Sequence, residues 1–338
     1  MLKKIGLFLL LVLFLMGAAA LYLFKSKALN IQSETYFKVH KQDNINTLSS
    51  RLNKEMGLKY PYLFELVSRK MNLERWIKNG RFTLKPDMTI IELIRELRSG
   101  KAQTVNFVVK GITDLDKFAN NCGVALEPDK DDFLFALNDI NLLDSLGFNL
   151  ETVYALPLPD TYNMYWHTQP DELLIKLKKE YDLFWNQERI NKAKNIGLSP
   201  IQVSVLASIV CKETSKNDEM PKVAQLYLNR LKLNMALQAD PTVIFANREK
   251  EIRRVLNEHL QTESPYNTYK NKGLPPGPIC IPSKQAIEAV LNPYTHNDLY
   301  MCAKEDFSGY HNFAESYSDH LLNAKRYQAA LDRKKIMK

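Results

Sequence analysis

The pattern of apolar residues separates one long uncharged run near the N-terminus from the short periodic segments that follow. The run extends from Ile5 to Phe24, and at about 1.5 Å per residue it matches the roughly 30 Å apolar core of a bilayer. Lys3 and Lys4 precede it, which favours a cytoplasmic N-terminus. The alanines at 18–20 could mark a cleaved signal peptide, but the run stays apolar beyond them. We therefore expect residues 1–27 to form an uncleaved anchor in the cytoplasmic (inner) membrane, with the remaining chain on its extracytoplasmic (periplasmic) side.

Residues 28–105 are predicted to form a linker and a small α/β module. Helix signals are clear: Gly57 ends one apolar stripe, and Thr89 with Glu92 forms a capping box that opens another helix. The expected elements are strands over 36–40 and 81–84 and helices over 45–56, 63–71 and 89–100. This strand-helix-helix-strand order resembles the LysM-like fold, a small domain that binds wall glycans, although a structural spacer is also consistent with it.

The remaining chain, residues 106–338, is predicted to be a larger mixed domain, so that the overall class is α+β. A strand over 104–109 leads into it, and Gly111 to Thr113 opens a mostly helical stretch. We expect a proline-punctuated loop with nearby aromatic residues over 158–162. Near the C-terminus we expect a strand over 299–303, a turn at Gly309 and a final helix.

One helix in this domain places a carboxyl group among apolar side chains. Ser199 followed by Pro200 is a typical helix start. Val203, Leu206, Val210 and Glu213 then share one stripe at a period of 3.6 residues, while Ser204, Ser208 and Lys212 share a narrow polar side. A carboxyl group held against apolar side chains loses hydration, which raises its pKa as a general acid requires. The alternative is a glutamate at a frayed helix end that reaches solvent.

Composition and charge favour some classes of protein and exclude others. The chain is 45% hydrophobic, as expected of a globular protein, and its formal net charge is +8. The basic residues are scattered without interleaved aromatics, so we do not expect nucleic acid as a partner. The positive excess suits anionic lipids or an anionic polymer, but also an ordinary solvated surface. The cysteines have no metal-ligand spacing and are expected to be buried free thiols; they are Cys122, Cys211, Cys280 and Cys302.

Five short motifs follow one another in the second half of the chain. They are ASIVCKET at 207–214, NRL at 229–231, LQADPTV at 237–243, YNTY at 266–269 and GLPPGPI at 273–279. Taken in this order, they resemble the signature series of the membrane-anchored endolytic murein transglycosylases, the YceG-like family. The resemblance covers essentially the whole chain and is most specific between Ala207 and Ile279.

The resemblance implies which residues form the site. Glu213 corresponds to the family's catalytic acid, whereas Cys211 replaces a first glutamate and is expected only to pack. Tyr154-Ala155 replaces a Glu-Gly pair, and Ile281 and Ser283 stand where Asn and Gly are usual. The expected substrate-binding residues are Asn229, Gln238, Asp240, Thr242, Tyr266, Asn267 and Tyr269. For Asp240, which precedes Pro241, a role as a helix N-cap remains the alternative.

The implied reaction is non-hydrolytic cleavage of the bond between N-acetylmuramic acid and N-acetylglucosamine in a peptidoglycan strand, which leaves a 1,6-anhydro end. The muramic acid C6 hydroxyl is the nucleophile, so one carboxyl group suffices where ordinary glycosidases need two. No metal or cofactor is called for, and the implied partners are glycan strands, the membrane and, as candidates, peptidoglycan synthases. The alternatives are a hydrolytic muramidase that uses Glu213 and Asp240, or a non-catalytic scaffold for wall binding or division.

Overall fold

The computed structural model describes residues 21–22, 24–111, 114–247, 252 and 255–334. The predicted span from Ile5 to Phe24 therefore lies almost wholly outside the described residues, as does most of the predicted helix start at 111–113. The chain divides into two compact units. Unit 1 extends to Asn106 and includes the short segments Ala125–Glu127 and Asn163–Thr168, and unit 2 comprises the rest. Among the described helices none is by itself long and apolar enough to cross a bilayer; two, bent by 74° at their junction, reach that length and composition only as a pair.

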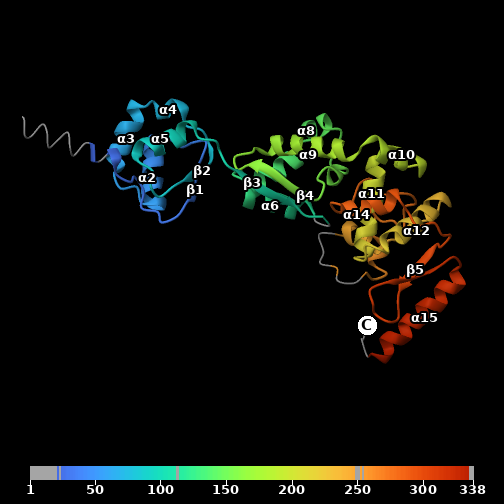
Figure 1. Ribbon diagram of the computed structural model, residues 1–338. Coiled ribbons are helices and arrows are strands. Elements are labelled where there is room, and N and C mark those ends of the chain that lie inside the picture. Colours follow the sequence, from blue (N-terminus) through green and yellow to red (C-terminus); the bar gives the residue numbers. More distant parts are fainter. Residues whose placement is uncertain (1–20, 23, 112–113, 248–251, 253–254, 335–338) are drawn as a thin grey trace, which may run out of the picture. The chain divides into compact units, whose positions relative to one another are not determined.

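Unit 1 contains the strands and helices that the sequence predicts between residues 35 and 100 (Figure 1). Strand β1 (Thr35–Val39) pairs antiparallel with β2 (Gly80–Leu84), with Phe37 opposite Phe82. The helices are α2 (Ile45–Met56), α3 (Pro61–Lys70), the short α4 (Leu73–Trp76) and α5 (Ile90–Ser99). The predicted stop at Gly57 is confirmed, because its φ of 62° lies in the left-handed region that glycine tolerates. The capping box of Thr89 and Glu92 is also present.

The segment that we predicted as a loop over 158–162 is partly a strand. Strand β4 (Asp160–Tyr165) is hydrogen-bonded to β3 (Thr104–Val109) in a two-stranded sheet. Tyr162 and Met164 are buried while their neighbours are exposed, which is the alternation of a strand with one covered face. The loop prediction is wrong because the prolines before the strand obscured this two-residue period.

Unit 2 is mainly helical and ends in a β-hairpin packed on a long helix. Its first helices are α6 (Leu115–Ala125), α7 (Lys130–Leu137), α8 (Ile140–Ser145), η1 (Val153–Ala155), α9 (Pro170–Phe184) and α10 (Gln187–Asn195). The later ones are α11 (Pro200–Glu213), α12 (Met220–Lys232), α13 (Asp240–Ala246), η2 (His259–Gln261), α14 (Lys284–Leu291) and α15 (Tyr317–Arg333). The hairpin pairs β5 (Tyr300–Ala303) with β6 (His311–Ala314), and both strands contact α15 (Figure 1). The strand, turn and final helix predicted for this region are confirmed.

Helix α11 is the centre of unit 2, because α10, α12, α13 and α14 all contact it. It begins as predicted, with Ser199 as N-cap and Pro200 in the first turn. Every residue from Val203 to Cys211 is buried, so the predicted polar side is exposed only at Lys212. Ser204 and Ser208 are tolerated inside because their hydroxyls donate to the carbonyls of Pro200 and Val205. Each fully buried Leu or Val contributes roughly 1.5–3 kcal/mol, which holds the C-terminal end of α11 in a fixed place.

Candidate active site

A cavity of about 250 Å³ lies at the C-terminal end of α11. Its walls come from the last residue of α11, one face of α12, the chain around the start of α13, and the β5–β6 hairpin. The lining residues are Glu213, Leu226, Tyr227, Arg230, Leu237, Gln238, Asp240, Tyr269, Met301, Cys302, Ala303 and His311.

Glu213 is held in this cavity by a hydrogen bond from a buried tyrosine. The hydroxyl of Tyr227, a residue only 2% exposed, donates to Glu213 Oε1 at 2.9 Å. Burial raises the pKa of Glu213 to about 7, and the nearby charge of Asp240 acts in the same direction. The Tyr227 hydroxyl and the Arg230 guanidinium oppose this rise but do not cancel it. The frayed, solvated alternative for Glu213 is therefore excluded, and the carboxyl group can give or take a proton near neutral pH.

Asp240 and Tyr269 form a second polar pair in the cavity. The Tyr269 hydroxyl donates to Asp240 Oδ1 at 2.6 Å. Asp240 is not the N-cap of its helix, because α13 starts at Asp240 itself and the cap position is Ala239. The capping alternative is therefore wrong by one position, and the carboxylate is left exposed at the cavity.

Arg230 braces the wall of the cavity through backbone carbonyl groups. This buried side chain donates from Nε to the Leu299 carbonyl at 2.6 Å and from Nη1 to the Leu237 carbonyl at 2.7 Å. It therefore ties α12 both to the residue before β5 and to the chain before Gln238. The fixed fork of donors in a guanidinium suits this double attachment.

Four of the predicted site residues are brought together: Glu213, Gln238, Asp240 and Tyr269 all line the cavity. Gln238 has a φ of 51°, in the left-handed region, and its N–H donates to the Thr268 carbonyl at 3.1 Å. A non-glycine residue in this region is uncommon and is often found at a functional site. The bend places an exposed side chain at the edge of the cavity.

The other predicted binding residues lie outside the cavity and hold its surroundings. Asn267 is fully buried, and its Nδ2 donates to the carbonyls of Leu260 and Thr262, each at 2.9 Å. Asn229 Nδ2 donates to the carbonyls of His296 and Asp298. Both amides organise loops, and a fully buried Asn267 has no surface for a glycan. Asn267, expected among the substrate-binding residues, therefore lies in the scaffold of the site and not on its surface.

Thr242 and Tyr266 also pack away from Glu213. The buried Thr242 hydroxyl lies 2.8 Å from that of Thr268, which joins α13 to the YNTY segment. The Tyr266 ring packs on the Phe245 ring with 4.8 Å between centroids, and the Tyr154 ring also contacts the Phe245 ring, edge-on. The GLPPGPI loop is largely buried, and its last residue, Ile279, donates its backbone N–H to Ser208 Oγ on α11 at 3.0 Å.

Cys211 lies on the side of α11 that faces the GLPPGPI loop. Its Sγ lies 3.7 Å from that of Cys280, and both thiols are buried. Neither lines the cavity that contains Glu213. Of the other departures from the family motifs, Ile281 is buried and Ser283 is the N-cap of α14. Each replacement therefore has a packing or capping role.

Two polar residues of the cavity, Tyr227 and His311, were not predicted from the sequence as site residues. Tyr227 sits in an apolar helical stripe, where a tyrosine is indistinguishable from a core residue. His311 follows the turn at Gly309, and nothing in its neighbourhood connects it with α11. The Asn-Arg pair of the NRL motif was a usable signal for Arg230.

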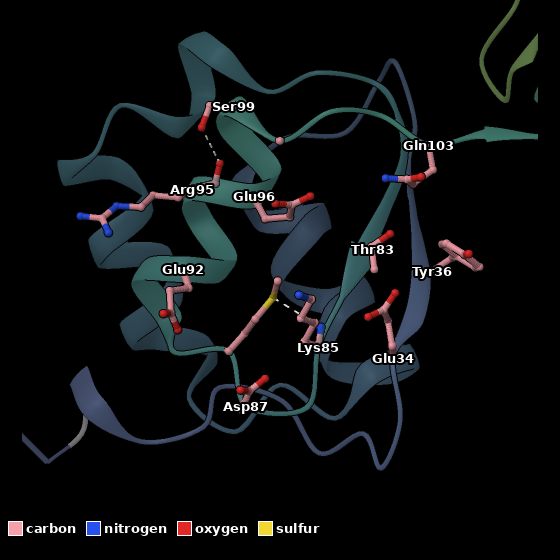
Figure 2. Close-up of a pocket in the computed structure, with 12 residues that line it drawn as sticks. Glu34, Tyr36, Thr83, Lys85, Asp87, Glu92, Arg95, Glu96, Ser99 and Gln103 are labelled. Atoms are coloured by element: carbon pink, nitrogen blue, oxygen red, sulfur yellow. Dashed lines mark hydrogen bonds between the residues drawn. The ribbon is translucent and has the colours of Figure 1, made fainter.

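A separate hollow of about 840 Å³ lies in unit 1 (Figure 2). It is formed by the start of β1, the end of β2 and α5, and its polar side chains carry both charges. Tyr36, Lys85 and Glu96 are examples, from β1, the residue after β2, and α5. None of the predicted site residues lies here.

The cavity contains a half-buried carboxyl group, a second carboxylate and two tyrosines. Such an arrangement is typical of enzymes that use acid–base catalysis on a polar substrate. Comparison with known proteins makes this class specific. Residues 37–326 match the YceG-like family, and the chain belongs to that family.

Relatives and a solved structure are consistent with this assignment. The endolytic murein transglycosylase of Bacillus subtilis is 31% identical over 188 residues, which cover 56% of this chain and 49% of the relative. That of Streptococcus pneumoniae strain R6 is 25% identical over 319 residues, covering 84% of this chain and 56% of the relative. The chain thus spans about half the length of these relatives. A crystal structure of a YceG-like protein from Listeria monocytogenes shares the fold, with a TM-score of 0.57 and 24% identity over 86% of this chain and 99% of that one.

Proposed function

We propose that this protein is a membrane-anchored endolytic peptidoglycan lytic transglycosylase, with Glu213 as its general acid and base. The observation that carries the proposal is the half-buried carboxyl group with a pKa raised to about 7 in a polar cavity. The relatives named endolytic murein transglycosylase supply the substrate class. Such an acid is protonated often enough at neutral pH to donate, and its conjugate base is strong enough to accept.

The reaction needs one proton to leave Glu213 and one to return. Protonated Glu213 gives its proton to the oxygen that leaves N-acetylmuramic acid C1 as the glycosidic bond breaks. The C6 hydroxyl oxygen of the same sugar then bonds to C1, and its proton passes to the Glu213 carboxylate. The products are a 1,6-anhydro end and a free hydroxyl on the released N-acetylglucosamine, with Glu213 protonated again. The hydrogen bond from Tyr227 stabilises the carboxylate between these two transfers.

A hydrolytic muramidase is the second candidate, because Asp240 lines the same cavity. In that reaction a second carboxylate acts as nucleophile or activates water. Mass spectrometry separates the two: 1,6-anhydro ends indicate the transglycosylase, and reducing ends indicate the muramidase and assign the second role to Asp240.

The test of Glu213 is a digestion of purified glycan strands by the wild type and by Glu213→Gln. Glutamine keeps the shape but cannot transfer the proton, so the rate should fall by at least roughly 10²- to 10⁴-fold while glycan binding survives. Glu315→Gln is a matched control, because Glu315 is an exposed glutamate in the same unit that does not line the cavity. Full activity in Glu213→Gln would refute the mechanism. Absence of turnover in the wild type would refute the enzymatic function and favour the non-catalytic scaffold.

We further propose one anchor over Ile5 to Phe24, with the chain from residue 28 onward outside the cytoplasm and residues 28–105 as a linker and a LysM-like module that binds wall glycan. Its support is the length of the uncharged run and the strand and helix order of unit 1. Peptidoglycan synthases are the partners we propose at that location. Protease added to spheroplasts should remove the C-terminal unit; protection of that unit, while control periplasmic proteins are cut, would show that the topology is wrong.

A further inference from the structure

A histidine and a buried glutamate form a pair at the edge of the Glu213 cavity. His311, the first residue of β6, lines that cavity. Its Nδ1 lies 2.9 Å from Glu219 Oε2, and its backbone N–H donates to Glu219 Oε1 at 2.7 Å. Glu219 precedes α12 and is only 4% exposed. Both oxygens of one buried carboxylate are therefore directed at a single residue 92 positions further along the chain.

This contact determines which ring nitrogen is available to a ligand. A carboxylate only accepts hydrogen bonds, so Nδ1 carries the hydrogen and Nε2 of the neutral ring is an acceptor. No hydrogen bond between Nε2 and another of the described protein groups is present. The ring thus has one nitrogen fixed by the protein and the other unused, in a residue that faces the cavity. An oriented imidazole of this kind recurs where histidine acts on a substrate or metal.

The contact between His311 and Glu219 also has a structural effect. The pair joins the β5–β6 hairpin to α12, and that connection could be its whole purpose. The adjacent pair makes a similar connection, because the Tyr310 hydroxyl lies 3.1 Å from each carboxylate oxygen of Asp218. The hairpin is therefore tethered independently of His311, and a tether does not explain why His311 also lines the cavity.

We propose that His311 contacts the substrate, its Nε2 accepting a hydrogen bond from a hydroxyl of the sugar bound beside Glu213. Glu219 is the positioning residue that fixes the ring and its tautomer. The inference rests on the proposed function and adds a second substrate-contacting group to the site. The ligand is a neutral sugar hydroxyl, so no proton need be transferred to His311.

Two substitutions at His311 separate the roles of its two nitrogens. In His311→Asn the amide nitrogen can replace Nδ1 and keep the contact with Glu219, but nothing replaces Nε2. In His311→Gln the side-chain amide reaches the place of Nε2 instead. We expect His311→Asn to melt like the wild type and to lose roughly tenfold or more in kcat/KM, the effect of one lost hydrogen bond. His311→Gln should recover part of that loss.

Glu219→Gln and the double variant test the positioning role. In Glu219→Gln, the amide NH₂ of glutamine faces one of the two N–H groups of His311 that the carboxylate accepted from. This contact disturbs the tautomer of the His311 ring, so the rate should fall. If Glu219 acts through His311, Glu219→Gln combined with His311→Asn should be no slower than His311→Asn alone. Tyr310→Phe, which removes only the neighbouring tether, should keep the wild-type rate. Nitrogen-15 chemical shifts of the ring should report a hydrogen on Nδ1 in the wild type and its loss in Glu219→Gln.

The outcomes distinguish this inference from the function on which it rests. A wild type that releases no fragments from glycan strands overturns both. An active wild type with a fully active His311→Asn variant overturns the inference alone, as do additive losses in the double variant or a ring hydrogen found on Nε2. If His311→Asn fails to fold, the chemical shifts and the rate of His311→Gln still decide.

Discussion

Replacing Tyr227 by phenylalanine should move the pH profile of the enzyme to higher pH. The variant loses one hydroxyl, the one that donates to Glu213 Oε1 at 2.9 Å. That hydrogen bond favours the ionised carboxyl group and holds its pKa down, although burial still keeps the value at about 7. Without it the pKa of Glu213 rises, and the acid stays protonated to higher pH.

The size of the shift follows from the two protonation states. A hydrogen bond to a charged group is worth about 1.5–3 kcal/mol, and one to a neutral group about 0.5–1.5 kcal/mol. The difference is about 1–1.5 kcal/mol, which is close to the free energy of one pKa unit. At pH 8 the protonated fraction of Glu213 should therefore rise from about a tenth to about a half.

The assay is the initial rate of anhydro-end release between pH 5 and 9 for the wild type and Tyr227→Phe. The alkaline limb should move up by about one unit, whatever happens to the maximal rate. Tyr310→Phe is the control, because it also removes a hydroxyl bonded to a carboxylate, but outside the cavity. An alkaline limb that stays in place or moves down would refute the reasoning.

Three further predictions concern stability. The pKa of Glu213 is raised above its ordinary value of 4.5 to about 7, so ionisation favours the unfolded state; stability should fall by up to roughly 3 kcal/mol as the pH rises from 4.5 to 7. Thermal melts should show Glu213→Gln lacking this loss, and parallel curves for the two proteins would contradict it. Asn267→Ala should lower the free energy of unfolding by about 2–4 kcal/mol in urea titrations, because the Leu260 and Thr262 carbonyls and the Tyr269 N–H lose their partner. An unchanged unfolding midpoint together with lost activity would instead make Asn267 a substrate-binding residue. Cys211→Ala should cost about 1 kcal/mol of packing and keep most activity, and a large loss of turnover in a folded variant would give Cys211 a catalytic share.

The features that could be predicted from the sequence are those set by local rules. Helix α11 was recognisable from Ser199, Pro200 and the apolar period, because caps and periodicity act within a few residues. Glu213 at its end followed from the same period. The burial of Ser204 and Ser208 could not be predicted in this way, because it depends on the contacts that α12, α13 and α14 make with α11.

The binding residues show where local reasoning ends. An asparagine in a loop suits a sugar as well as it suits backbone carbonyls, and only the packed structure assigns Asn267 to the second role. The sequence placed Asp240 at the N-cap, whereas it is the first residue of α13. The error arises because a proline such as Pro241 is tolerated at either of the first two helical positions. The contact between Glu219 and His311 joins residues far apart in the sequence, and no pattern in either neighbourhood signals it.

The order in which the cavity walls occur along the chain has a consequence for biosynthesis. Glu213 ends α11 and is made before His311, which belongs to β6, with only α15 after it among the described elements. A chain emerging from N-terminus to C-terminus therefore carries its acid long before it carries a closed cavity. A chain cut before β6 lacks part of the cavity wall, so the proposed chemistry of Glu213 has to wait until β6 has been made and folded.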